Sequence, residues 1–201
     1  MQRRQEYDSF KWNRDMQIEV PRKRFTVDEF HRMGDTGVLT EGDRLELIEG
    51  EIVKMTPIGN RHLGCVNAAV TKLAIALAGR AVISGQNPLQ LSDQSEPQPD
   101  IVVLKPRQDF YRSRRPEASD SLLVIEVADT SIKYDRDLKL RLYARAGVPE
   151  VWIEDLKDNV LLVYRDVSED EYKTQLSLPR SATVSPQAFP DVVLQVEEML
   201  G

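Results

Sequence analysis

The chain lacks several features that define common protein classes. Its single cysteine, Cys65, excludes an internal disulfide and a cysteine-rich zinc site. No apolar run approaches the roughly 18 residues that a membrane-spanning helix needs. The polar segment 1–10 also lacks the apolar stretch of a signal peptide. We therefore expect a protein of the reducing cytoplasm that does not insert into a membrane.

The chain also has no excess of positive charge, because 33 Asp and Glu outnumber 27 Lys and Arg, for a formal net charge of −6. A chain of this charge is not expected to coat nucleic acid without specificity. The basic residues are unevenly distributed, however. One group crowds residues 1–24, and a second follows an apolar run near the middle: Lys105, Arg107, Arg112, Arg114 and Arg115. The second group could bind phosphates locally, although loop charges are more often simply solvated.

The length and the hydrophobic periodicity predict one domain with a mixed sheet. Residues 1–24 have no periodicity and are predicted to be a basic arm, and 25–201 a single domain. Three helices are expected: a short one after a capping box at Thr26 to Glu29 and ending at Met33, a long one capped by Asn60, and one over 134–146. An antiparallel hairpin is expected over 44–55, with its turn at Glu49-Gly50. Further strands are expected at 81–83, 89–91, 99–104, 122–128, 151–153, 160–164 and 172–176, and 192–194 fits strand or helix. The fold class is α/β (α+β mixed), with a mixed sheet flanked by helices and additional antiparallel hairpins.

Two acids stand in neighbouring apolar runs that read as buried strands. Asp100 opens the run 99–104, and Glu126 lies deep in the run 122–128. A carboxylate removed from water without a partner costs several kcal/mol, and two in adjacent strands repel each other. A divalent cation between them would explain both acids, and carboxylate oxygens suit Mg²⁺ or Mn²⁺. The competing interpretation is that Glu126 pairs with an arginine inside the fold.

Lys139 is the third member of this constellation. Residues 135, 138, 139, 142 and 146 share one face of a regular helix, and the leucines among them must face the sheet. Lys139 is therefore predicted at the edge of the buried face, where its long stem could reach the two acids. An Asp135–Lys139 pair at i,i+4 spacing is the alternative, worth only a few tenths of a kcal/mol.

Several short motifs, in this order, resemble one known family. They are Arg44 to Glu51 (RLELIEGE), His62, Gln98-Pro99-Asp100, Val124 to Val127 (VIEV), Tyr134-Asp135-Arg136 through Lys139 and Tyr143, and Ala146 to Trp152 (AGVPEVW). Together they resemble the Uma-type family of endonucleases, within the PD-(D/E)XK restriction-endonuclease-like superfamily. The resemblance covers about residues 26 to 198.

The resemblance implies a restriction-endonuclease-like fold and a metal-dependent phosphodiesterase. The acids that hold Mg²⁺ in that superfamily map to Asp100 and Glu126. The usual lysine, two residues after the glutamate, is replaced here by Ala128, and Lys139 matches the family pattern for a lysine moved to the next helix. Glu46, His62 and Asp135 match as supporting residues. Glu46 is expected to be an outer ligand or to face solvent. His62 is expected either as an exposed first-turn residue or, turned inward, as a phosphate ligand or general base.

These observations lead to one expected function and two rivals. The expected function is an endonuclease that hydrolyses nucleic acid, with DNA as the favoured substrate, using Asp100, Glu126 and Lys139 around Mg²⁺ or Mn²⁺. A homodimer would let two such sites cut both strands. The first rival is a nuclease-like binding module without turnover, suggested by Ala128. The second is a glycosidase-like carboxylate pair, which ranks last because the aromatic fraction of 6% offers few surfaces for sugar stacking.

Overall fold

A six-stranded mixed sheet forms the centre of the molecule in the computed structural model, which describes residues 22–55, 57–129 and 135–201. The predicted arm at 1–24 therefore lies largely outside the described residues. The strands follow the order β3-β4-β5-β6-β7-β8. Their bounds are Val82–Gly85, Ile101–Leu104, Ser121–Ala128, Val151–Asp155, Val160–Ser168 and Glu171–Pro179. The pair β5–β6 is parallel and the other neighbouring pairs are antiparallel, which confirms the expected mixed sheet.

Helices cover the two faces of this sheet because apolar residues of β5 alternate in direction. Leu123, Ile125 and Val127 belong to one core cluster, together with apolar residues of the long helix α2 (Asn60–Ala76). Val124 and Ala128 belong to the opposite cluster, together with residues of α4 (Leu140–Arg145). A π-helical turn, η3 (Asp135–Lys139), leads directly into α4. Since η3 and α4 connect β5 to β6, they provide the crossover that a parallel pair requires.

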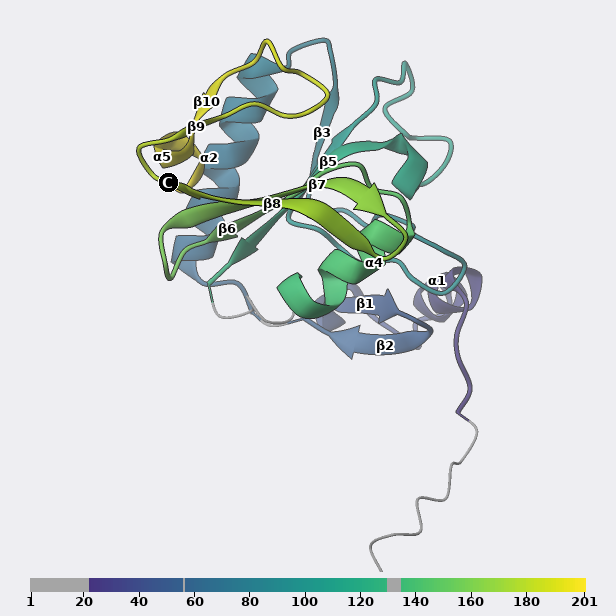
Figure 1. Ribbon diagram of the computed structural model, residues 1–201. Coiled ribbons are helices and arrows are strands. Elements are labelled where there is room, and N and C mark those ends of the chain that lie inside the picture. The colour runs from purple at the N-terminus through teal and green to yellow at the C-terminus, as the bar shows by residue number, and fades with distance from the viewer. Residues whose placement is uncertain (1–21, 56, 130–134) are drawn as a thin grey trace, which may run out of the picture.

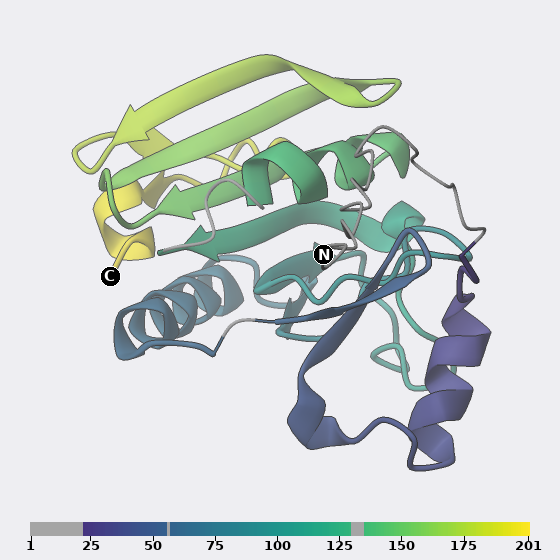
Figure 2. The ribbon, with the colours of Figure 1, turned by 90° about the horizontal axis from the view of Figure 1, so that it is seen from below.

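Smaller elements surround the sheet at two ends (Figures 1 and 2). Helix α1 (Val27–Asp35) and the hairpin β1 (Leu45–Ile48) and β2 (Glu51–Lys54) lie together at one end. The short strands β9 (Thr183–Val184) and β10 (Leu194–Gln195) and helix α5 (Val196–Met199) lie beside α2. Two 3₁₀ turns complete the fold, η1 (Glu41–Asp43) and η2 (Ala118–Asp120). Among the described residues, no helix combines the length and apolar character that crossing a bilayer requires.

Local signals in the sequence explain where the first elements begin and turn. Thr26 accepts from the Glu29 backbone N–H while the Glu29 side chain accepts from the Thr26 N–H, which confirms the predicted capping box. The β1–β2 turn places Gly50 at φ 76°, where a β-carbon would also collide with Arg24. Glycine is therefore required at this turn, and the predicted hairpin is confirmed.

Three sequence-based expectations were wrong. Residues 89–91 form no strand, because Gln90 makes only an isolated bridge to Glu117. Asn60 is the first residue of α2 rather than its cap, and Gly59 occupies the capping position without a side-chain hydrogen bond. The helix expected over 134–146 is not regular either, since η3 widens its first turn. Residue 134 lies outside the described residues.

Candidate functional site

The pairing of β4 with β5 brings the two predicted acids together. Ile101 of β4 lies opposite Ile125 of β5, so Asp100 follows beside Glu126. The backbone N–H of Asp100 donates to Oε2 of Glu126 at 3.3 Å. Glu126 is 3% exposed, and the side chain of Asp100 is 14% exposed. The acids therefore meet at one end of the paired strands, with Asp100 nearer the solvent.

Lys139 reaches this pair from η3, within the crossover between β5 and β6. Its ammonium nitrogen lies 3.3 Å from Oε1 of Glu126 and 2.8 Å from Oε1 of Glu46. Lys139 is only 4% exposed, so it lies deeper than the predicted edge of the buried face, and its stem reaches Glu126 as expected. The physical reason is the face that the following helix buries: Tyr143, four residues after Lys139, is fully buried, so the buried face runs through both residues.

Glu46 comes from the separate β1–β2 hairpin and completes the ion pairs. It is 3% exposed, so it does not face solvent, although its neighbour Leu47 is also buried. Its Oε1 accepts the backbone N–H of Gln98 at 2.9 Å as well as the Lys139 ammonium. Glu46 therefore connects the hairpin both to the segment that precedes Asp100 and to the lysine.

His62 turns inward and contacts Asp100. Its Nε2 lies 3.0 Å from Oδ2 of Asp100, an oxygen that also accepts the Val127 backbone N–H at 2.9 Å. The other oxygen, Oδ1, receives only a long contact from the Gln86 side-chain amide, at 3.4 Å. Since α2 begins at Asn60, its first turn points the imidazole across the end of β4. These contacts fix the orientation of Asp100.

Tyr143 is a further member of the site, which the sequence analysis named in a motif but gave no role. Its hydroxyl donates to Oε1 of Glu126 at 2.5 Å, and the residue is fully buried. The available signal was its i+4 spacing from Lys139, which places both side chains on one helical face. We call the group of Glu46, His62, Asp100, Glu126, Lys139 and Tyr143 the acid–lysine centre. The side chain of Asp135, the other predicted supporting residue, lies outside the part that the structure describes.

Two of the five basic residues in the loop after β4 are paired with nearby carboxylates. Arg107 pairs with Asp109 through two hydrogen bonds of 2.7 and 2.9 Å. Arg114 pairs in the same way with Asp120, and the Arg114 hydrogen bonds lower the pKa of Asp120. The remaining contacts are weaker or not ionic: Lys105 Nζ donates to a backbone carbonyl of Ser119, and Arg115 lies 3.9 Å from Glu96. Arg112 makes no ion pair with any described residue.

A second buried acid lies on the α2 face of the sheet. Oε2 of Glu154 accepts a hydrogen bond from the Cys65 thiol at 2.6 Å, whereas its Oε1 has no hydrogen-bond partner among the described residues. Burial raises the pKa of Glu154 to about 8, an effect that the negative charge of Asp100 reinforces. Burial, and then the neighbouring Glu154 carboxylate, also raise the pKa of the Cys65 thiol. Cys65 is a free, buried cysteine.

The donor set of the acid–lysine centre fits a hard divalent cation. Three carboxylates stand against a single ammonium, so the centre carries an excess of negative charge. Mg²⁺ commonly binds one or two protein carboxylates and completes its shell with water and substrate phosphate. Asp100 and Glu126 match that requirement, although the described residues contain no cluster of three or more histidine, cysteine or acidic side chains around a common point suited to a metal.

Comparisons with known proteins agree with this architecture. A crystal structure titled as a putative nuclease belonging to DUF820 from Anabaena variabilis ATCC 29413 superposes with a TM-score of 0.67 and 17% identity. The match covers 88% of this chain and 97% of that one, and at this identity it shows the fold alone. No curated protein matches the chain significantly. The model of the Uma2 family, described as "Putative restriction endonuclease", matches residues 27–197. The chain therefore belongs to the Uma2 family.

Proposed function

We propose that the protein is a metal-dependent endonuclease that hydrolyses phosphodiester bonds in nucleic acid, with DNA as its substrate. The observation that carries the proposal is the convergence of Asp100, Glu126 and Lys139, which reach the acid–lysine centre from the residue before β4, from β5 and from η3. Family membership supports the class of reaction. Ala128 does not remove the ammonium group from the site, because Lys139 supplies one to the same glutamate.

Asp100 and Glu126 would hold the cation. When bound, Mg²⁺ or Mn²⁺ supplies neutralisation of phosphate charge and a more acidic water molecule. Tyr143 and the Val127 N–H orient the two carboxylates through hydrogen bonds of 2.5 and 2.9 Å. Loss of an outer-shell contact of this kind commonly lowers metal affinity about 10- to 100-fold.

Lys139 would act on the substrate rather than on the metal. Its ammonium is positioned by Glu46 and Glu126, so it enters the reaction already desolvated and oriented. A fixed positive charge in a site that excludes water stabilises the charge that develops on the phosphate oxygens. The same group can orient the attacking water. His62 contacts Asp100 and is assigned to positioning that carboxylate.

A cleavage assay tests the proposal directly. Purified protein is incubated with labelled single-stranded DNA, double-stranded DNA and RNA, each with Mg²⁺, Mn²⁺ or EDTA. We expect cleavage of DNA with either cation and none with EDTA. The Asp100→Asn and Lys139→Met variants, prepared in parallel, should be inactive, which excludes a contaminating nuclease. Cleavage by both variants at the wild-type rate would overturn the assignment of the site.

A nuclease-like binding module is the second candidate, and Ala128 favours it. The superfamily pattern implied by the sequence places a lysine at this position, whereas Ala128 is a fully buried residue of the core on the α4 face. This alternative expects nucleic-acid binding without turnover under every cation. The cleavage assay and a binding assay on the same samples therefore separate the two candidates.

A further inference from the structure

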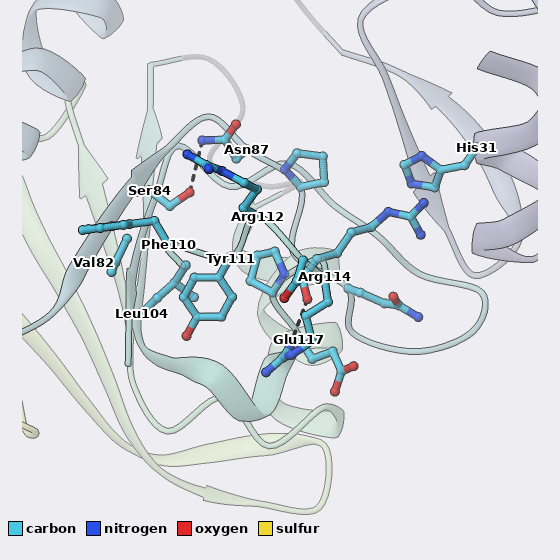
Figure 3. A pocket seen from close by; sticks show the side chains of 15 residues that line it. His31, Val82, Ser84, Asn87, Leu104, Phe110, Tyr111, Arg112, Arg114 and Glu117 are labelled. Atoms are coloured by element: carbon cyan, nitrogen blue, oxygen red, sulfur yellow. Dashed lines mark hydrogen bonds between the residues drawn. The ribbon is translucent and has the colours of Figure 1, made fainter. Parts of the chain in front are cut away.

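A cavity of about 720 Å³ lies outside the acid–lysine centre, over the β3 edge of the sheet. Its floor includes Val82 and Ser84 of β3 and Leu104 of β4, and the loop after β4 forms its wall (Figure 3). Leu104 and Val102 belong to the α4-face cluster, so the cavity opens on the face that Glu126 occupies. Asn87 lines the cavity directly after Gln86, whose side chain contacts Asp100.

The loop presents a phenylalanine to solvent in an unfavourable backbone conformation. Phe110 is 75% exposed and has φ 50°, and the next residue, Tyr111, has φ 62°. Bulky residues rarely adopt this left-handed region, and such strain persists only where surrounding contacts enforce it. An exposed aromatic ring gains nothing from the core. The cost lies in the backbone, and strained backbone of this kind clusters at ligand-binding and active sites.

Side-chain contacts within the loop enforce this conformation. Asp109 accepts both Arg107 hydrogen bonds, the backbone N–H of Tyr111 at 3.3 Å and the Ser113 hydroxyl at 2.5 Å. The Tyr111 hydroxyl donates to the Lys105 carbonyl, and the guanidinium groups of Arg107 and Arg114 lie 5.3 and 5.6 Å from the Tyr111 ring centroid. The Tyr111 side chain therefore stabilises the loop through these contacts, whereas the Phe110 ring has no cation or aromatic partner among the described residues.

Arg112 supplies an available cation beside Phe110. The guanidinium groups of Arg107 and Arg114 are matched by carboxylates, whereas Arg112 is exposed and has no ion-pair partner among the residues described. Figure 3 shows Arg112 extending towards Ser84 and Asn87, with Phe110 beside Val82 and His31 at the opposite end of the cavity. The Asn87 amide nitrogen donates to Ser84 and to the Gly85 carbonyl, which leaves its oxygen as an acceptor.

We propose that this cavity binds the unpaired strand of nucleic acid next to the scissile bond, with a base stacked on Phe110 and a phosphate on Arg112. The inference rests on the proposed nuclease function and specifies its substrate as nucleic acid with a single-stranded stretch. An aromatic ring can stack on a base only if that base has left the duplex stack, and an aromatic platform beside a basic group is how proteins hold single strands.

The spacing between the cavity and the acid–lysine centre suits a flanking strand. Leu104 and Asp100 lie at the two ends of one extended segment. At about 3.3 Å per residue, they are separated by roughly 13 Å. A stacked strand advances about 3.4 Å per nucleotide and an unstacked strand advances further, so this distance is spanned by about four nucleotides or fewer. The same strand can therefore occupy both sites.

Binding of fluorescent oligonucleotides in EDTA tests the inference without cleavage. Wild-type protein should bind a single-stranded oligonucleotide more tightly than its duplex. Phe110→Ala should weaken single-strand binding about 5- to 100-fold, the usual range for one stacked base. Arg112→Ala should also lower the salt dependence, reducing the slope of log K against log salt by about 0.7. Ile75→Ala on α2 and Lys173→Ala on β8 remove an exposed apolar group and an exposed cation elsewhere, and neither should change binding.

A stability measurement separates a binding role from a structural one. Phe110→Asn places a residue that tolerates positive φ at this position, so we expect unchanged or higher resistance to urea together with weaker binding. Phe110→Trp should retain binding. The inference is overturned if Phe110→Ala and Arg112→Ala bind as wild type does, if duplex binds more tightly than single strand, or if wild-type protein binds neither. Wild-type binding by the two variants, or tighter binding of duplex, would leave the nuclease proposal standing. If wild-type protein binds neither oligonucleotide, the cleavage assay still tests the nuclease proposal separately.

Discussion

The ammonium nitrogen of Lys139 lies 3.3 Å from Oε1 of Glu126, and the hydroxyl of Tyr143 donates to that same oxygen at 2.5 Å. Both donors come from the crossover between the parallel strands β5 and β6. The connection that the sheet topology requires therefore also delivers the groups that orient the glutamate. Substitutions at different residues of the centre can therefore test cation binding, catalysis and stability separately.

Asp100→Asn should remove metal binding while preserving the fold. The amide keeps the size of the side chain but loses the negative charge that a divalent cation requires. We expect Mn²⁺ affinity to fall more than about 10- to 100-fold, since even outer-shell substitutions cost that much. Calorimetric titration measures the change, and Asp191→Asn, an exposed acid paired with Arg80, serves as the matched control. Unchanged affinity in Asp100→Asn would remove this residue from the metal site.

Lys139→Met should abolish turnover, retain Mn²⁺ binding and destabilise the fold. The substitution leaves Glu46 and Glu126, each 3% exposed, without their shared ammonium. Breaking a buried ion pair on one side costs about 3–5 kcal/mol. Urea unfolding measures the loss, and Lys72→Met, which removes an exposed pair with Glu198, should cost about 0–1 kcal/mol.

A second substitution distinguishes the catalytic role of Lys139 from its structural role. Adding Glu46→Gln to Lys139→Met removes one of the two stranded charges, so part of the lost stability should return. Cleavage should not return, because the double variant still lacks the ammonium. If activity recovers with stability, Lys139 is only a structural residue.

Glu154→Gln should change how stability depends on pH. Burial raises the pKa of Glu154 to about 8 from an ordinary value of 4.5, so between these values the folded protein holds a proton that the unfolded chain has lost. Stability therefore falls as pH rises through this window, by up to about 1.4 kcal/mol per pH unit from this group. The glutamine variant lacks this pH-dependent contribution. The free energy of unfolding of the variant should therefore rise relative to that of wild type from pH 5 to pH 8.

Urea midpoints recorded across that range measure the effect of Glu154. A constant offset introduced by the amide does not affect the comparison, because the prediction concerns the slope. Glu197→Gln, at an exposed position of α5, should follow the wild-type curve. Parallel curves for wild type and Glu154→Gln would show that Glu154 does not titrate in this window.

Cys65 should resist alkylation in the native protein. Its thiol is buried, it donates to Glu154 at 2.6 Å, and its raised pKa disfavours the reactive thiolate. Iodoacetamide labelling at pH 8 should be slow and should accelerate with urea in step with unfolding. Mass spectrometry follows the modification. Rapid labelling without urea would mean that α2 opens locally around this residue.

The sequence alone determined the strands and the meeting of the two acids. Apolar runs around Asp100 and Glu126 favour two buried strands that follow each other in the chain, and the structure pairs them as β4 and β5. The capping box at Thr26 and the Glu49-Gly50 turn are likewise local signals that the surrounding fold did not override. Local sequence is sufficient where the competing backbone conformations differ strongly in burial or steric cost.

Only the tertiary structure decided which other side chains join these acids. Periodicity placed Lys139 at the edge of a buried face, but the folded helix buries the face that holds Lys139 and Tyr143, and Lys139 forms ion pairs there with Glu46 and Glu126. Glu46 faces the lysine because a separate hairpin docks there, and Phe110 faces solvent because Asp109 and its neighbours hold the loop. These positions depend on contacts between segments that are far apart in the chain. Periodicity and spacing within one segment do not reveal the free energies of such contacts.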